Sequence, residues 1–128
     1  MSTIEPTQEQ LETIAARPEG PVVMVNLLRY KRDAAGNKVG ADSYMKYTEA
    51  VTPMVIELGG KPIWAGRPDS IVIADHGHQW DAVILVEYPS PQAFLQMISS
   101  PEYLAIHHLR ADGLEEAGLI ATTPGELV

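Results

Sequence analysis

Arg110 is the residue whose setting in the sequence most favours binding chemistry. It falls on the apolar stripe of a predicted helix, which consists of Ile106, Leu109, Arg110, Gly113, Leu114 and Ala117. A guanidinium that enters or borders a core needs an anionic partner or several acceptors. One interpretation is a structural ion pair with Glu87, which alternation places with Val83 and Leu85 on a covered strand. The other interpretation makes Arg110 a clamp for the carboxylate of a substrate.

His107 is the first candidate for moving a proton. It lies one turn after Tyr103, so its imidazole could face a cavity, and an imidazole titrates near neutral pH. We consider His107 or Glu87 as the catalytic residue; a packed, hydrogen-bonded imidazole or a haem axial ligand are the alternatives for His107. His76 and His78 lie in a predicted turn, where two ligands without any cysteine favour solvated histidines over a metal site. We therefore predict no metal and no cofactor.

Four further side chains are candidates for substrate binding. Asn26 is a polar residue in the middle of an apolar strand. It could donate its amide to a ligand oxygen and stabilise an oxyanion, or it could satisfy a buried backbone group or a dimer contact. Tyr44, Tyr47 and Trp64 could form aromatic walls of the same cavity, although tyrosines on a helix stripe are more often core residues. The sequence contains no serine elbow, phosphate loop, dinucleotide fingerprint or zinc-protease helix.

A small set of predicted elements must position these side chains. Thr7 and Gln10 match a capping box, and Ser90 and Ser100 each precede a proline in the pattern of a helix start. Pro53 should bend or split the helix that contains it. In chain order, we predict a helix over 7–16, a strand over 22–30, a helix over 42–58, strand-like runs over 62–66 and 70–74, a strand over 81–88, a helix over 90–98, a second helix ending at 117, and a strand over 119–123.

The order of these elements indicates the fold class. Once the first helix is set aside and 61–74 is counted as one interrupted strand, the order is βαββαβ, which is that of a ferredoxin-like α+β fold with an antiparallel sheet. We expect 70–74 and 81–88 to pair as a hairpin. Two helices on one face leave the other face of the sheet needing cover. Because the strands over 22–30 and 81–88 are apolar on both faces, we expect a second copy of the chain to supply that cover.

Composition narrows the classes of partner. The chain has 128 residues and a formal net charge of −8, which argues against binding to nucleic acid or to an anionic membrane surface. The absence of cysteine removes disulfides, thiol nucleophiles and thiolate metal sites together. The amino terminus lacks a secretory pattern, and no stretch approaches the roughly twenty apolar residues of a membrane span. We expect a cytoplasmic protein.

Several short motifs together resemble one known family. They are Val25 to Tyr30, the Trp80-Asp81 pair, Glu87 to Ser90 with Ala93 and Phe94, and Ser100 to Tyr103 with Arg110. The chain is similar over about 22–120 to an uncharacterised bacterial family, domain of unknown function 1330, of the dimeric α/β-barrel superfamily. The resemblance implies two ferredoxin-like subunits that press their sheets together. Related families include cofactor-free monooxygenases, small lactone isomerases and dehalogenase-like or haem-dependent enzymes, so membership leaves the chemistry open.

These observations lead to one leading hypothesis. Residues 1–21 form a helical appendage, and residues 22–128 form a ferredoxin-like dimeric α/β-barrel domain with a small, mostly apolar pocket between sheet and helices. The protein would be a cofactor-independent enzyme for a small organic acid or aromatic compound. Arg110 would orient the anion, Asn26 would stabilise an oxyanion, and His107 or Glu87 would move the proton. The alternative is a non-catalytic small-molecule-binding module, or a dimeric structural module whose polar core residues only fix the dimer.

Overall fold

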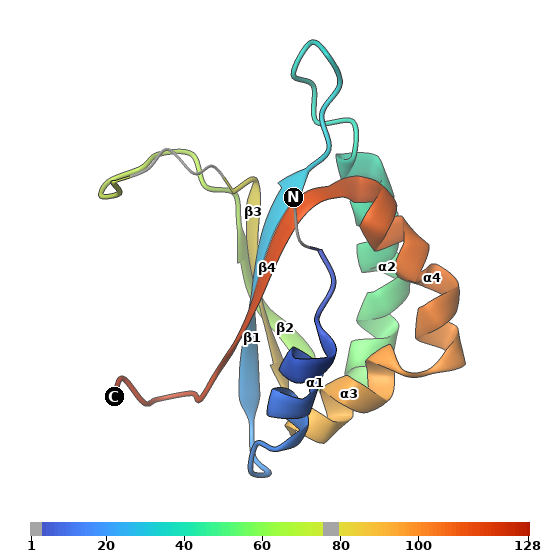
Figure 1. Ribbon diagram of the computed structural model, residues 1–128, viewed down its shortest axis with the longest axis vertical. Coiled ribbons are helices and arrows are strands. Elements are labelled where there is room, and N and C mark those ends of the chain that lie inside the picture. Colours follow the sequence, from blue (N-terminus) through green and yellow to red (C-terminus); the bar gives the residue numbers. More distant parts are fainter. Residues whose placement is uncertain (1–3, 76–79) are drawn as a thin grey trace.

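A four-stranded antiparallel sheet with its helices on one face forms the body of the protein (Figure 1). The computed structural model describes residues 4–75 and 80–128. The elements are α1 (Gln8–Ala15), β1 (Val22–Tyr30), α2 (Ala41–Glu57), β2 (Lys61–Gly66), β3 (Ala82–Tyr88), α3 (Pro91–Ile98), α4 (Pro101–Gly113) and β4 (Leu114–Thr122). The strands lie in the order β2-β3-β1-β4. This is the predicted ferredoxin-like α+β fold, preceded by one additional helix.

Three of the predicted helix starts are confirmed by their hydrogen bonds. The Thr7 hydroxyl accepts from the Gln10 backbone N–H while the Gln10 side chain accepts from the Thr7 N–H, which completes the capping box of α1. The hydroxyls of Ser90 and Ser100 accept from the backbone N–H of Ala93 and Tyr103 and so cap α3 and α4, each with proline in the first turn. By contrast, α2 runs through Pro53 without a break, because its residues on both sides of the proline pack into the core.

The run over 70–74 is not a strand, and the predicted hairpin with β3 does not form. The two edges of β3 are already paired, one with β2 and the other with β1. No edge of β3 remains for 70–74, and its apolar side chains lie in solvent, with Val72 90% and Ile73 94% exposed. The predicted turn with His76 and His78 lies outside the described residues. None of the described helices has the length and apolar character to span a bilayer.

The last helix also ends earlier than predicted, at Gly113 and not at Ala117. Gly113 packs its backbone against Gly40, and the chain becomes extended at the next residue, Leu114. Leu114 and Ala117 therefore reach the core from β4, where Ala117 lies opposite Leu28 of β1. Their spacing placed Leu114 and Ala117 on the apolar stripe of a predicted helix, but both are residues of β4 that face the core.

The two faces of the sheet differ in their cover. The face toward the helices holds fully buried residues of the core, including Val22, Met24 and Leu28. No helix of the described chain covers the other side, which we call the open face (Figure 1). The register of the pairs, with Val25 opposite Leu85, places these apolar residues on the open face: Val23, Val25, Leu27, Val83, Leu85 and Ile120.

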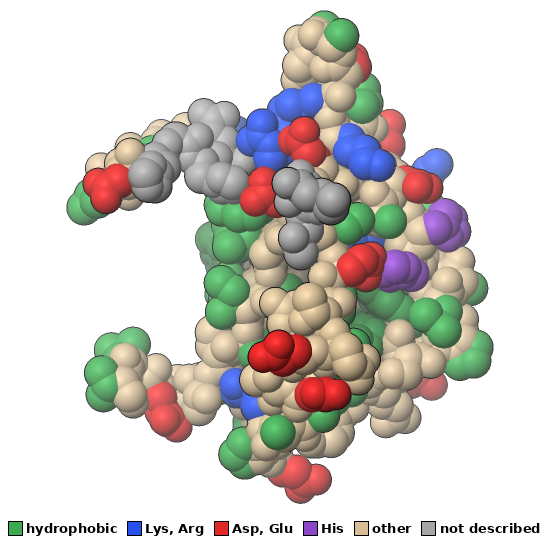
Figure 2. Space-filling model, in the orientation of Figure 1, with side chains coloured by type: hydrophobic (Ala, Val, Ile, Leu, Met, Phe, Trp, Pro, Cys, Tyr) green, Lys and Arg blue, Asp and Glu red, His purple; other side chains and the backbone are tan. Residues whose placement is uncertain are grey.

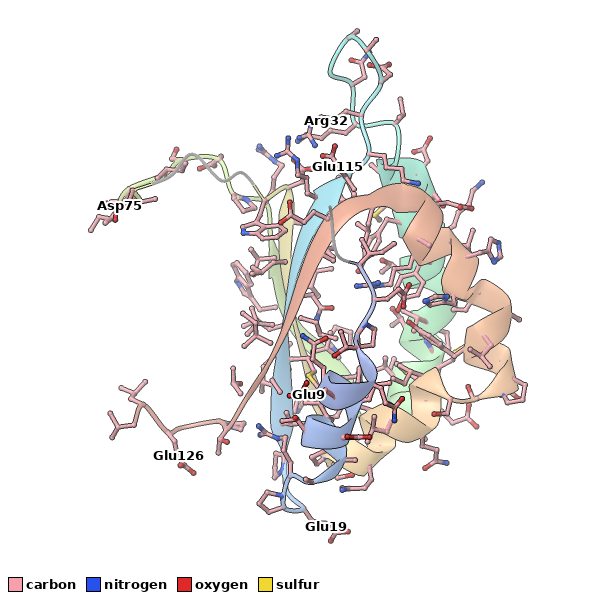
Figure 3. The ribbon with its side chains drawn as sticks, in the orientation of Figure 1. Glu9, Glu19, Arg32, Asp75, Glu115 and Glu126 are labelled. Carbon is pink, nitrogen blue, oxygen red and sulfur yellow. The ribbon has the colours of Figure 1, made fainter. Side chains whose placement is uncertain are left out.

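A buried carboxylate fixes the loop between β1 and α2 to the sheet. Asp81 is 6% exposed and accepts from the backbone N–H of Tyr30 at 2.8 Å. Arg32 donates to both of its carboxylate oxygens, at 2.7 and 3.0 Å, and the Lys38 ammonium lies 3.5 Å away. Bidentate pairing of this kind compensates the cost of burying the carboxylate. The cluster lies at one end of the strands, beside the Arg32 and Glu115 labels in Figure 3.

Candidate functional site

A cavity of about 940 Å³ lies between the sheet and the helices. Its floor comes from all four strands, β1 to β4, and its walls come from α2, α3 and α4. Residues 4–17, which we call the N-terminal segment, supply a further wall. The lining is largely apolar, and its polar or titratable side chains include Glu5, Asn26, Tyr44, Tyr47, Tyr103, His107 and Arg110. A concave, mostly apolar space with few polar groups is typical of a small-molecule site.

Arg110 and His107 both lie on the wall of this cavity, and both contact the N-terminal segment. The guanidinium of Arg110 donates a hydrogen bond to the backbone carbonyl of Ile4. Nε2 of His107 lies 2.8 Å from a carboxylate oxygen of Glu5. Two neighbouring turns of α4 therefore hold two consecutive residues of the chain that precedes α1. The prediction that these two side chains share one site is thus compatible with where the structure places them.

Glu87 lies on the wrong side of the sheet to take part in this site. It pairs in register with Val23 on the open face, and its carboxylate is 3.9 Å from the Lys61 ammonium. The ion pair between Arg110 and Glu87, which was one of the two interpretations of Arg110, is therefore wrong. Alternation correctly grouped Glu87 with its neighbours on one face of β3, but it could not tell which face the helices cover.

Trp64 is also outside the cavity. Trp64 is on β2, where it lies opposite Leu85 of β3, and it is 56% exposed. The register between β2 and β3 shifts between residues Pro62 and Trp64. The ring of Trp64 packs over Gly66, where an added Cβ would lie only 2.4 Å from the indole. Pro62 and Ala65 line the cavity in its place. A one-residue shift at an irregular pairing exchanges the faces of the residues that follow, and the sequence did not reveal this shift.

Asn26 lines the cavity, but its amide nitrogen is already bonded. Nδ2 donates to the backbone carbonyl of Met24 at 3.4 Å and to that of Ile84 at 3.2 Å. Because an amide nitrogen has two hydrogens, this leaves none for a ligand oxyanion. Of the three interpretations from the sequence, hydrogen bonding to backbone groups is the one observed. Among the described residues none donates to Oδ1 of Asn26, so the group that Asn26 can offer a ligand is an acceptor.

The tyrosines of α2 are core residues and cavity walls at the same time. Tyr44 is 4% and Tyr47 is 8% exposed, and their ring centroids lie 5.3 Å apart. The Tyr47 hydroxyl lies 2.9 Å from the hydroxyl of Tyr103 on α4. Burial raises the pKa of all three phenols, although the positive charge of Arg110 acts in the opposite direction. The site therefore presents neutral aromatic surface and neutral hydroxyls beside one guanidinium.

Sequence reasoning missed Glu5. This residue precedes the capping box of α1, in a stretch whose pattern indicated only a helical appendage. No periodicity links residue 5 to residue 107, because the contact joins two elements through tertiary packing alone. Within the part of the chain that the structure describes, no group of three or more histidine or carboxylate side chains could hold a metal ion.

Fold and site together define a ferredoxin-like α+β domain with an internal cavity that is lined by tyrosines and carries one arginine. Residues 38–123, which are more than half of the chain, match the family described as Domain of unknown function (DUF1330). The chain belongs to this family, as its motifs indicated. No curated protein matches the chain significantly.

Solved structures share the fold over most of the chain. A protein of unknown function from Rhodopseudomonas palustris is 32% identical, with a TM-score of 0.87 and coverage of 99% of this chain and 100% of that one. Hydroxynitrile lyase from Passiflora edulis is 16% identical, with a TM-score of 0.65 and coverage of 87% and 99%. A dimeric ferredoxin-like protein of unknown function from Thermobifida fusca is 14% identical, with a TM-score of 0.51 and coverage of 82% and 92%. The latter two likenesses concern the fold alone.

Proposed function

We propose that the protein is a cofactor-independent enzyme that acts on a small organic acid or aromatic compound in this cavity. The observation that carries the proposal is the guanidinium of Arg110 in a mostly apolar, tyrosine-walled space. Among the described lining residues, Arg110 is the single lysine or arginine. Its planar donors match a carboxylate, which would become the fixed point of a bound acid.

The dimensions and walls of the cavity suit a small molecule with an apolar body. A volume of about 940 Å³ lies in the range of small-molecule sites, which is roughly 300–1,000 Å³. Tyr44, Tyr47 and Phe94 offer ring surface against which an aromatic or aliphatic body can pack. The free Oδ1 of Asn26 would accept from a hydroxyl or N–H of the ligand.

His107 is the group that we assign to proton transfer. It lies one turn from Arg110 on the same wall, and the centroid of its ring is 5.8 Å from the ring centroid of Tyr103. A bound acid anchored at Arg110 would therefore lie within reach of the imidazole, which can accept or donate a proton. Glu87, the other candidate from the sequence, has no part in this proposal because it is on the open face.

A homodimer that covers the open face is a further part of the proposal. The apolar residues of that face have no cover from the described part of the chain, and two apolar segments project beyond the face. These segments hold Ile71, Val72 and Ile73 on one side and Leu127 and Val128 on the other, all exposed. Figure 2 shows hydrophobic side chains on the sheet between the two projections, which are marked by Asp75 and Glu126 in Figure 3. A second copy would bury this surface.

Matched pairs of acids and amides test the binding step. Benzoate with benzamide, and hexanoate with hexanamide, differ in charge and little in shape. We expect the acids to raise the melting temperature of the wild-type protein and the amides not to do so, and Arg110→Gln to lose this preference. Arg67→Gln, which removes an equal charge from an exposed position outside the cavity, is the control. No preference for any acid in the wild-type protein would contradict the proposal.

Deuterium exchange tests the catalytic step for any reaction that begins with removal of a proton beside a carbonyl. Carbonyl-containing acids such as phenylpyruvate would be incubated with the protein in heavy water, and loss of that proton would be followed by NMR. We expect exchange above the buffer rate with the wild-type protein, and a loss of it with His107→Gln. Acids that bind without any exchange would instead favour the alternative, a non-catalytic small-molecule-binding module.

A further inference from the structure

The N-terminal segment supplies acceptors to the two side chains that the proposed function assigns to the ligand. Arg110 donates to a carbonyl oxygen at Ile4, and His107 contacts a carboxylate oxygen at Glu5. Glu5 is the single carboxylate among the described residues that line the cavity. One stretch of chain thus offers a carbonyl oxygen to Arg110 and a carboxylate to His107. An organic acid would offer oxygen acceptors of the same kinds to these two side chains.

The segment is held at its two ends and packs weakly between them. At the far end, Arg17 donates to the carbonyl of Thr122 at 3.4 Å and to the hydroxyl of Thr123 at 3.3 Å. Between these ends, α1 contributes no fully buried residue, and Ile14 is only partly buried against the core. A helix of eight residues with little buried surface has little stability of its own. Figure 1 shows the residues before α1 running along β4, on the helix side of the sheet.

We propose that residues 4–6 occupy the anion subsite of the cavity and that the carboxylate of the ligand displaces them from Arg110 and His107. The N-terminal segment is then a competing occupant of the site and a movable wall of the cavity. This inference rests on the proposed function, because it takes the same acid as the ligand. A ligand that must displace an internal competitor binds more weakly by the free energy of that competition.

Two substitutions weaken the competitor without touching the anchoring arginine. Glu5→Gln removes the negative charge from the contact with His107 but keeps the shape of the side chain. Arg17→Gln loosens the far end of the segment, outside the lining of the cavity. Their charge-matched controls are Glu19→Gln and Arg67→Gln, both at exposed positions, and Figure 3 places Glu19 beyond the far end of α1.

The experiment measures the dissociation constant of benzoate and hexanoate by titration calorimetry for the wild-type protein and these four variants. We expect Glu5→Gln and Arg17→Gln to tighten binding of at least one of the acids by about fivefold or more, which is the lower end of typical coupling between sites. The controls should stay within about twofold of the wild-type value. Saturation with the acid should also speed hydrogen exchange of the backbone amides of Leu11 to Ala15 in the wild-type protein.

The outcomes separate this inference from the function on which it rests. Binding of an acid that is unchanged or weakened in both variants, with exchange in α1 unaltered or slowed, would overturn the competition and leave the proposed function intact. Failure of every acid to bind the wild-type protein and both loosened variants would overturn the proposed function and this inference together. Tighter binding of an acid by Glu5→Gln and Arg17→Gln, with the two control variants unchanged, supports both the competition and the proposed function.

Discussion

Gly40 and Gly113 lie so close together that neither position has room for a side chain. A Cβ added at Gly40 would lie 2.1 Å from the carbonyl oxygen of Gly113, and one added at Gly113 would lie 2.7 Å from the carbonyl oxygen of Gly40. This backbone contact joins the start of α2 to the end of α4. It also fixes the point at which the chain leaves α4 and enters β4, so it sets the orientation of the helix that carries His107 and Arg110.

We expect Gly113→Ala to destabilise the fold by about 1–3 kcal/mol, because the added methyl group must push two backbone segments apart. Alanine is otherwise the better helix residue, so a loss of stability would show that the contact outweighs helix propensity. Gly118→Ala is the control, since its nearest neighbour is the movable Leu27 side chain at 3.3 Å. Urea unfolding measures both. Equal stability of the two variants would contradict the expectation.

Asp81 makes a second prediction possible. The substitution Asp81→Asn keeps the shape of the buried side chain but removes the negative charge that Arg32 and Lys38 contact. Arg32 remains partly solvated, so we expect a loss of about 2–3 kcal/mol in the free energy of unfolding, and not the larger cost of a fully buried pair. Asp69→Asn, at an exposed position, should change stability by less than about 0.5 kcal/mol.

The carboxylate of Asp81 also makes the stability of the fold depend on pH in the acid range. Burial pushes the pKa of Asp81 upward, but hydrogen bonds from Arg32 and from the Tyr30 N–H, with the charges of Arg32 and Lys38, outweigh burial and lower it overall. Its contribution to stability is therefore present above the unfolded-state pKa of about 4 and is lost as the pH falls through the lower folded-state value. From neutral pH down to about pH 4, wild type should remain more stable than Asp81→Asn, and at lower pH this difference should shrink. A difference in the free energy of unfolding that stays constant as the pH falls further would contradict this.

The tyrosines predict the behaviour at high pH. Burial raises the pKa of all five, Tyr30, Tyr44, Tyr47, Tyr88 and Tyr103, above the ordinary value. The neutral phenols thus stabilise the fold below the unfolded-state pKa of about 10, and this contribution is lost as the pH rises beyond it. Tyrosinate absorbance should rise only with unfolding, and near pH 10 in denaturant. Reversible ionisation near pH 10 with native circular dichroism would contradict the prediction.

The proposed dimer predicts an effect of charge on the open face. Val25 lies at the centre of that face, so we expect Val25→Glu to yield monomers with the circular dichroism of the wild-type protein. Met45→Glu adds the same charge to an exposed position of α2 and should leave the dimer intact. Sedimentation velocity distinguishes the two. A wild-type protein that is monomeric at every concentration would overturn the proposed dimer.

The sequence predicted those features that depend on local chemistry. The capping box at Thr7, the serine caps at Ser90 and Ser100 and the strand over 22–30 follow from short-range hydrogen bonds and steric preferences, and all are present. The order of elements then limits the fold to few topologies, since connections are short and neighbouring strands pair.

The errors arose where local patterns have two solutions. The run over 70–74 has the composition of a strand, but pairing depends on a free edge elsewhere in the sheet. Glu87 was assigned to the cavity because alternation defines two faces without saying which one the helices cover. Trp64 was assigned to it because the sequence did not reveal the irregular pairing between Pro62 and Trp64. The contact between Glu5 and His107 joins residues remote in sequence, and only the packed fold brings them together.

The position of β1 in the sheet has a consequence for synthesis. This strand emerges early from the ribosome, yet its two partners lie far downstream, with Val22 opposite Tyr88 on β3 and Val23 opposite Thr122 on β4. One edge of this apolar strand therefore stays unpaired until β3 has been translated, and the other edge stays unpaired until nearly all of the domain has been translated. Such non-local pairing slows folding and exposes a strand to wrong partners meanwhile. Nascent chains that stop before β4 should accordingly be strong clients of the cell's holding chaperones.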